Sequence, residues 1–102
     1  MDLEVIRIRF REGSYEISFH AEKERYAEDI SHEDLQNLFD SAEVIEHYPE
    51  DPRGESCLIL GYSEKRPIHV VCGYSSLDWM RIITVYLPKM PKWVNERTRN
   101  RR

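Results

Sequence analysis

The chain has 102 residues, of which 40% are hydrophobic and 33% are charged, and its formal net charge is −4. This length and composition predict one soluble globular domain and exclude a second domain of ordinary size. No apolar run approaches the roughly 20 residues that cross a bilayer, and the acidic start lacks a signal-peptide pattern. We therefore expect a cytoplasmic location and no membrane partner.

Charge is distributed unevenly along the chain. Residues 1–64 contain 6 Lys or Arg against 17 Asp or Glu, whereas residues 65–102 contain 9 against 2. The basic end, "NERTRNRR", predicts a flexible tail over residues 94–102, after a single domain over residues 1–93. Such a tail attracts nucleic acid or an acidic protein partner, and the alternative is a disordered end without a role.

The first segment, "VIRIRFR", alternates Ile6, Ile8 and Phe10 with arginines, which is typical of a strand with one buried face. A turn at Gly13 follows, and "SYEISF" repeats the alternation. The first 19 residues therefore predict a β-hairpin.

Two short helices are expected next. "HAEKERYAED" contains good helix formers and neither Gly nor Pro, and Ser31 with Asp34 resembles a capping box before a helix that runs to about Ser41. The pattern then returns to strands, with "EVIEHY", "SCLILGY", "PIHVVCGY" and "MRIITVYL" separated by short polar turns. Such short connections predict a four-stranded antiparallel meander, and the fold class is α+β.

The turns "SEKR" and "SSLD" set an expected register between the last three strands. The first turn places Cys57 opposite Cys72, and we expect both thiols to be reduced. The second turn places His69 opposite Thr84, with Tyr86 on the same face. This polar cluster has two interpretations: a groove in which His69 transfers protons, or a buried histidine that only hydrogen-bonds to a hydroxyl.

Several kinds of chemistry have no support in the sequence. The two Cys and four His show none of the ligand spacings of structural zinc sites. Neither a Gly-rich phosphate loop nor a nucleophile elbow is present. We therefore expect no metal and no cofactor.

One stretch resembles a known family. "FHAEKERYAEDISHEDLQNLFDSAEVIEHYPEDPRGESCLILGY", followed by "RPIHVV", "IITVYLP" and "KW", is similar to a family of small prokaryotic proteins called domain of unknown function 4258. Members look like relatives of the RelE and BrnT toxins, so the resemblance implies a RelE/barnase-like fold with helices on one side of a curved antiparallel sheet. The family pattern has a basic residue near Glu28, where this chain has an acid.

The resemblance implies a toxin-type endoribonuclease of a bacterial toxin–antitoxin pair, which cleaves RNA without a metal. Such chemistry needs a base, an acid and a cation that stabilises the phosphorane. The matching positions imply catalytic roles for His20, His69 and Tyr86, and substrate-binding roles for Arg25 and Thr84, while charge alone adds Arg81 and Lys89. RNA and an antitoxin-like protein are the expected partners. The alternative is a catalytically silent binding module of the same fold that docks a protein partner.

Overall fold

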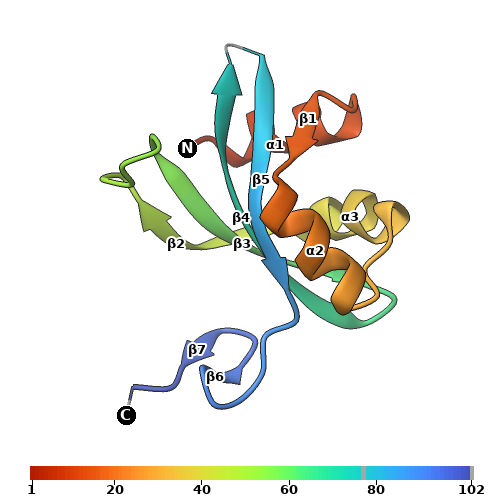
Figure 1. Cartoon of the computed structure of the whole chain (residues 1–102), viewed down its shortest axis with the longest axis vertical. Helices are drawn as coiled ribbons and strands as arrows, with labels where there is room; N and C mark the ends of the chain where they lie inside the picture. The colour runs from red at the N-terminus through yellow and green to blue at the C-terminus, as the bar shows by residue number, and fades with distance from the viewer. Residues whose placement is uncertain (77, 102) are drawn as a thin grey trace.

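The computed structural model describes residues 1–76 and 78–101 and shows an α+β fold (Figure 1). Three helices and one 3₁₀ turn precede or alternate with strands in the order α1 (Leu3–Arg11), β1 (Tyr15–Ile17), α2 (Phe19–Ala27), α3 (His32–Leu38), η1 (Phe39–Ser41), β2 (Glu43–Tyr48), β3 (Ser56–Ser63), β4 (Arg66–Ser76), β5 (Trp79–Tyr86), β6 (Trp93–Asn95) and β7 (Thr98–Arg99). A five-stranded sheet has the order β1-β5-β4-β3-β2, and β6 pairs with β7.

The predicted N-terminal hairpin is wrong, because its first strand is the helix α1. Asp2 caps this helix by accepting a hydrogen bond from the Glu4 backbone at 2.9 Å, and Ile6 and Phe10, four residues apart, are both buried. The alternation of Ile6, Ile8 and Phe10 also fits a strand with one buried face, but in the helix only Ile6 and Phe10 are buried and Ile8 is half exposed. At the end of the helix Gly13, with φ +77°, reverses the chain at no steric cost.

The second segment of that hairpin is a strand with a different partner. β1 pairs with β5 and runs parallel to it, with Tyr15 opposite Met80 and Ile17 opposite Ile82. The four later strands lie where the sequence predicted them and pair antiparallel in chain order. The sheet is therefore mixed and has five strands. The prediction contained the four antiparallel strands β2 to β5 but not the parallel edge strand β1.

Both predicted helices between the hairpin and the meander are present. Ser31 and Asp34 form a reciprocal capping box at the start of α3, in which each side chain accepts a hydrogen bond from the other residue's backbone. The expected end near Ser41 corresponds to the 3₁₀ turn η1, which continues α3 by one tighter turn.

The register between β3 and β4 is as predicted, but the register between β4 and β5 is not. Cys57 lies opposite Cys72, and both are free thiols. Thr84 lies opposite Val71 rather than His69. At the turn Ser76 pairs with Trp79, and two register shifts follow, one between Tyr74 and Ser76 and one, a bulge in β5, between Val71 and Cys72. In this register Met80 and Ile82 lie in the core and Arg81 is exposed.

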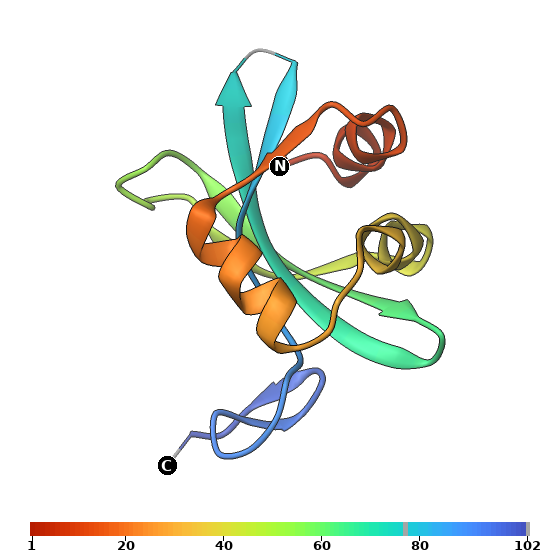
Figure 2. The same cartoon turned by 45° about the vertical axis from the view of Figure 1, so that its right-hand side comes forward.

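One face of the sheet packs against the helices. The buried core on this face joins α1, α2 and α3 to the sheet and contains Ile6, Phe10, Ala21, Leu35, Leu38, Ile59, Ile68, Val70, Ile82 and Val85. Figure 2 shows α1 and α3 beside each other on this side, with α2 crossing the sheet at an angle to both. The other face of the sheet has no helix over it.

The C-terminal hairpin β6–β7 covers part of that second face. It lies at the end of the molecule opposite the β4–β5 turn (Figure 1), and Trp93 packs its buried ring against His69, with the ring centroids 4.5 Å apart. Residues 94–101, where we expected a flexible tail, therefore contain paired strands, and Arg99 binds the Glu46 carboxylate of β2 at 2.7 Å. In the part of the chain that the structure describes, no helix is long and apolar enough to cross a membrane.

Candidate functional site

A cleft of about 460 Å³ opens on the helix-free face of the sheet. Three parts of the chain form it: the start of α2, the turn between β2 and β3, and the neighbouring segments of β4 and β5. Its polar lining consists of Ser18, His20, Arg53, Glu55, Tyr74, Ser75, Arg81 and Thr84, with Gly73 and Ile83 between them. At Gly73 a side chain would press on the Glu55 carbonyl oxygen, since an added Cβ would lie 3.1 Å from it.

His20 enters the cleft from the first turn of α2. Ser18 fixes that turn, because its hydroxyl caps α2 at Ala21 and also donates to the Ile83 carbonyl oxygen of β5 at 2.9 Å. Nε2 of His20 lies 3.2 Å from the Glu24 carboxylate, which in turn accepts the Val85 backbone N–H at 3.1 Å. Glu24 thus ties the imidazole to β5 and directs Nδ1 to be the acceptor nitrogen.

Arg53 and Arg81 bring guanidinium groups to the cleft, and the charge of Arg53 is balanced by Asp51. Arg53 is oriented by Asp51, whose carboxylate accepts from its Nε and Nη2 at 3.0 Å, and these bonds together with Ser56 lower the pKa of Asp51. Arg81 projects from the bulged strand β5, is exposed, and forms no ion pair within residues 1–76 and 78–101. Its guanidinium is therefore available to an anion in the cleft.

His69 and Tyr86 do not line this cleft. They face each other across β4 and β5 under the C-terminal hairpin, and His69 has no exposed surface. Nε2 of His69 donates to the Glu96 carbonyl oxygen at 2.7 Å, which leaves Nδ1 to accept from the Tyr86 hydroxyl at 3.2 Å. Burial lowers the pKa of His69 and raises that of Tyr86. Of the two interpretations of His69, the open groove is therefore wrong, and His69 is a buried histidine in a closed cluster.

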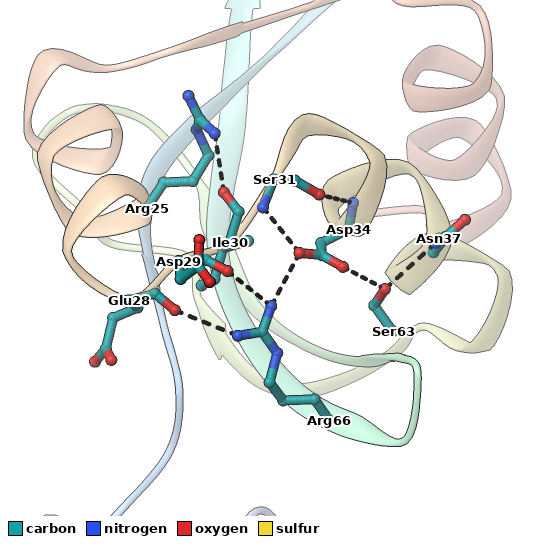
Figure 3. Close-up of polar contacts among 9 residues, drawn as sticks. All are labelled: Arg25, Glu28, Asp29, Ile30, Ser31, Asp34, Asn37, Ser63 and Arg66. Atoms are coloured by element: carbon teal, nitrogen blue, oxygen red, sulfur yellow. Dashed lines mark hydrogen bonds and ion pairs between the residues drawn. The ribbon is translucent and has the colours of Figure 1, made fainter.

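Arg25 and Lys89 make their contacts around α2, away from the cleft. The Arg25 guanidinium donates to the Glu22 carboxylate and, at 2.9 Å, to the Ile30 carbonyl oxygen (Figure 3). Lys89 pairs with Glu28 at 3.1 Å, so the acid that departs from the family pattern is neutralised. Of the seven residues proposed from sequence, the structure brings His20, Arg81 and Thr84 together and places His69, Tyr86, Arg25 and Lys89 elsewhere.

Sequence reasoning missed Glu24 and Arg53. Glu24 follows His20 by four residues, the spacing at which side chains meet on a helix, so this pair was detectable. Arg53 stands in the turn "PEDPRG", and only the folded chain shows that this turn approaches α2 and β5.

The cleft combines an imidazole, two guanidinium groups, several hydroxyls and the Glu55 carboxylate, which pairs with the Met1 amino group, around space open to solvent. Guanidinium groups bind phosphate through paired N–H donors, and an imidazole transfers protons near neutral pH. Among the described residues there is no group of three or more His, Cys, Asp or Glu arranged to hold a metal ion. The arrangement suits the binding of a phosphate ester with a proton-transfer group beside it.

Residues 17–87 match the family described as a domain of unknown function, DUF4258. The chain belongs to this family. In this DUF4258 protein the matched segment runs from β1 to the end of β5 and includes every residue of the cleft, whereas α1 and the hairpin that covers His69 lie outside it. Comparison with curated proteins and with solved structures gave no match.

Proposed function

We propose that this protein is a toxin-type endoribonuclease that cleaves RNA in the cleft without a metal ion. The supporting observation is the convergence of His20, Arg53 and Arg81 in one solvent-open cleft, with His20 held by Glu24. RNA cleavage by its own ribose needs a base, an acid and a cation; the cleft supplies the base and the guanidinium groups, and water serves as the acid.

The reaction starts when Nδ1 of His20 accepts the proton of a ribose 2′-hydroxyl. The 2′ oxygen then attacks the adjacent phosphorus, the bond from phosphorus to the 5′ oxygen breaks, and the leaving oxygen takes a proton from water. The products are a 2′,3′-cyclic phosphate and a 5′-hydroxyl end. Arg53 and Arg81 stabilise the negative charge that builds on the phosphorane oxygens.

The site differs from the one expected from sequence. We assign no step to His69, because its two ring nitrogens are already bonded to Glu96 and Tyr86 and it has no exposed surface. Arg25 and Lys89 are likewise engaged with Glu22, Ile30 and Glu28. Thr84 and Arg81 keep their expected place at the substrate.

The proposal includes the likeness to RelE and BrnT toxins and an antitoxin-like protein partner. What supports it is the architecture: three helices on one face of a sheet whose strands β2 to β5 are antiparallel, with a basic cleft on the other face. Cleavage in a cell by such an enzyme requires a partner that blocks the cleft until RNA is to be cut.

A second candidate is a catalytically silent binding module that docks a protein partner. It is favoured by the state of the basic tail, where Arg97 pairs with Glu43 and Arg99 pairs with Glu46. These arginines are neutralised by β2 and add little to phosphate attraction, and the net charge of −4 opposes RNA.

The deciding experiment incubates the purified full chain with a labelled single-stranded RNA in excess EDTA and identifies the product ends. We expect cyclic phosphate ends, and we expect His20→Ala and Arg81→Ala each to lower the cleavage rate by roughly 100-fold or more. His32→Ala is the matched control, because His32 is an exposed histidine that begins α3 outside the cleft.

Circular dichroism of each variant shows whether the fold is kept. Cleavage that persists in His20→Ala at the wild-type rate would show a contaminating nuclease and refute the site. An inactive wild-type chain that binds a protein partner through the same cleft would support the binding module instead.

A further inference from the structure

Helix α2 presents an aromatic stripe to solvent beside the cleft. Phe19 is 78% exposed and Tyr26 is 87% exposed, although both are large aromatic side chains. Lys23 lies between them and its Nζ is 5.0 Å from the centre of the Phe19 ring. Positions 19, 23 and 26 recur every three or four residues, so the three side chains share one face of the helix.

Exposed aromatic residues gathered on one face commonly mark a binding surface. The acidic residues of α2 do not oppose an anionic ligand there, because each is engaged: Glu22 with Arg25, Glu24 with His20 and the β5 backbone, and Glu28 with Lys89. Lys23 forms no ion pair in the described part of the chain, and its ammonium lies over the Phe19 ring. The stripe therefore combines two aromatic surfaces with one available cation.

The stripe begins beside the cleft in the sequence. Phe19 stands between Ser18 and His20, and both of these residues line the cleft. Helical rise separates Phe19 from Tyr26 by about 10 Å along α2, so the two rings meet different parts of an extended ligand. A strand bound at His20 that continues along α2 passes Phe19, Lys23 and Tyr26 in that order.

We propose that this stripe, Phe19, Lys23 and Tyr26, is a stacking platform for unpaired bases of the RNA strand that leaves the cleft. The inference rests on the proposed function and specifies its substrate as single-stranded RNA. Bases stack on exposed aromatic rings irrespective of sequence, and a cation between the rings meets the phosphate that links the bases. The cleft then supplies the chemistry, and α2 supplies affinity for flanking nucleotides.

The test compares two ligands of equal length and charge by fluorescence anisotropy. One is a single-stranded RNA oligomer with 2′-O-methyl riboses, which cannot be cleaved, and the other is the same backbone without bases. We expect the wild-type chain to bind the first about 10-fold more tightly, on the scale of one stacked base. Phe19→Ala and Tyr26→Ala should each reduce this preference and leave affinity for the abasic strand unchanged.

Phe19→Trp should retain the preference, because an aromatic ring remains. Ile8→Ala, which removes an exposed apolar side chain from α1, is the matched control and should bind both ligands as the wild type does. Circular dichroism and sedimentation of every variant confirm the fold and the association state.

The platform is refuted if the wild type binds both strands equally, or if the alanine variants keep the full preference. It is also refuted if the wild type self-associates and Phe19→Ala does not, because the stripe then binds a second copy of the chain. Failure of the proposed nuclease is a separate result: base-dependent binding through Phe19 without RNA cleavage would keep the platform and reject the enzyme.

Discussion

The Tyr86 hydroxyl lies 3.2 Å from Nδ1 of His69, and the two residues are direct partners on neighbouring strands. The opposite ring nitrogen of His69 bonds to the Glu96 carbonyl oxygen at 2.7 Å. A histidine with both nitrogens bonded in a closed cluster has no proton to exchange with a ligand. Its role is to connect β4 to the C-terminal hairpin, with Trp93 packed on its ring.

We expect His69→Ala to destabilise the fold and to leave the chemistry of the cleft intact. The substitution opens a cavity beneath Trp93 and leaves the Glu96 carbonyl without its donor, so unfolding in urea should require about 2–4 kcal/mol less. Tyr86→Phe, which removes only the hydroxyl, should cost about 1–2 kcal/mol. RNA cleavage per folded molecule should stay within about 3-fold of wild type; a 100-fold loss at full stability would return His69 to the reaction.

Stability should fall as the pH is lowered below about 6.5. Burial lowers the pKa of His69 in the folded chain, so the unfolded chain binds a proton first, and folding stability is lost as pH falls through the unfolded value near 6.5. Urea unfolding at pH 7.5 and 5.5 measures the difference. His69→Gln should show a smaller difference, because glutamine has no proton to gain, and an equal difference in both proteins would contradict this origin.

Arg66 should fasten the end of α2 to the start of α3. Its guanidinium donates to the Glu28 carbonyl at 3.3 Å, to the Asp29 carbonyl at 3.0 Å and to the Asp34 carboxylate at 2.9 Å (Figure 3). We expect Arg66→Ala to lower the unfolding free energy by about 1–3 kcal/mol. Arg66→Lys should recover only part of this loss, since an ammonium cannot reach three acceptors in one plane.

Full recovery in Arg66→Lys would mean that charge alone matters at this position. The Asp34 carboxylate stays charged beside Arg66. Burial disfavours its charged form, but the interactions with Ser63, Ser31 and Arg66 lower its pKa overall. Glu64→Ala, on the exposed turn between β3 and β4, is the control and should change stability by less than about 0.5 kcal/mol.

Gly61 marks the closest approach of α3 to the sheet. A Cβ at this position would lie 2.2 Å from the Leu38 carbonyl oxygen, which is backbone and cannot rotate away. Gly61→Ala should therefore force α3 off β3 and lower the free energy of unfolding by about 3 kcal/mol or more. Urea unfolding of both proteins measures the difference. A variant of wild-type stability would show that the helix shifts freely.

The sequence predicted the elements whose local signals agreed with their packing. Ser31 and Asp34 mark the start of α3 as a capping box. The four strands of the meander each alternate with a two-residue period and are separated by clear turns. The segment "VIRIRFR" fits a strand as well as the helix α1, because Ile6 and Phe10 satisfy both a two-residue and a four-residue spacing. Only the packing of both side chains into the core decides between them.

The candidate site was predictable only in part, because it depends on register. The bulge in β5 is one of two register shifts between β4 and β5. Together with the pairing of Ser76 and Trp79 at the turn, these shifts leave Thr84 opposite Val71 and Arg81 opposite Gly73, where both line the cleft. No local signal marks that bulge. Arg53 reaches the cleft through long-range folding of a turn, which one sequence without its fold does not reveal.

The last prediction concerns Glu24, a positioning residue behind His20. Its carboxylate lies 3.2 Å from Nε2 of His20 and accepts the Val85 backbone N–H, so it holds the imidazole beside β5 and leaves Nδ1 as the acceptor nitrogen. Glu24→Ala should lower kcat for RNA cleavage by about 10- to 100-fold with little change in KM, because the base is misplaced while Arg53 and Arg81 still bind phosphate.

Glu24→Gln separates orientation from charge at that position. The amide oxygen still accepts a hydrogen bond from Nε2–H, so it should restore much of the rate if orientation is the main effect. Glu22→Ala is the matched control, since Glu22 lies on the same helix but pairs with Arg25 outside the cleft. Equal rate losses in the Glu22 and Glu24 alanine variants would show that α2 is merely destabilised, and would remove Glu24 from the site.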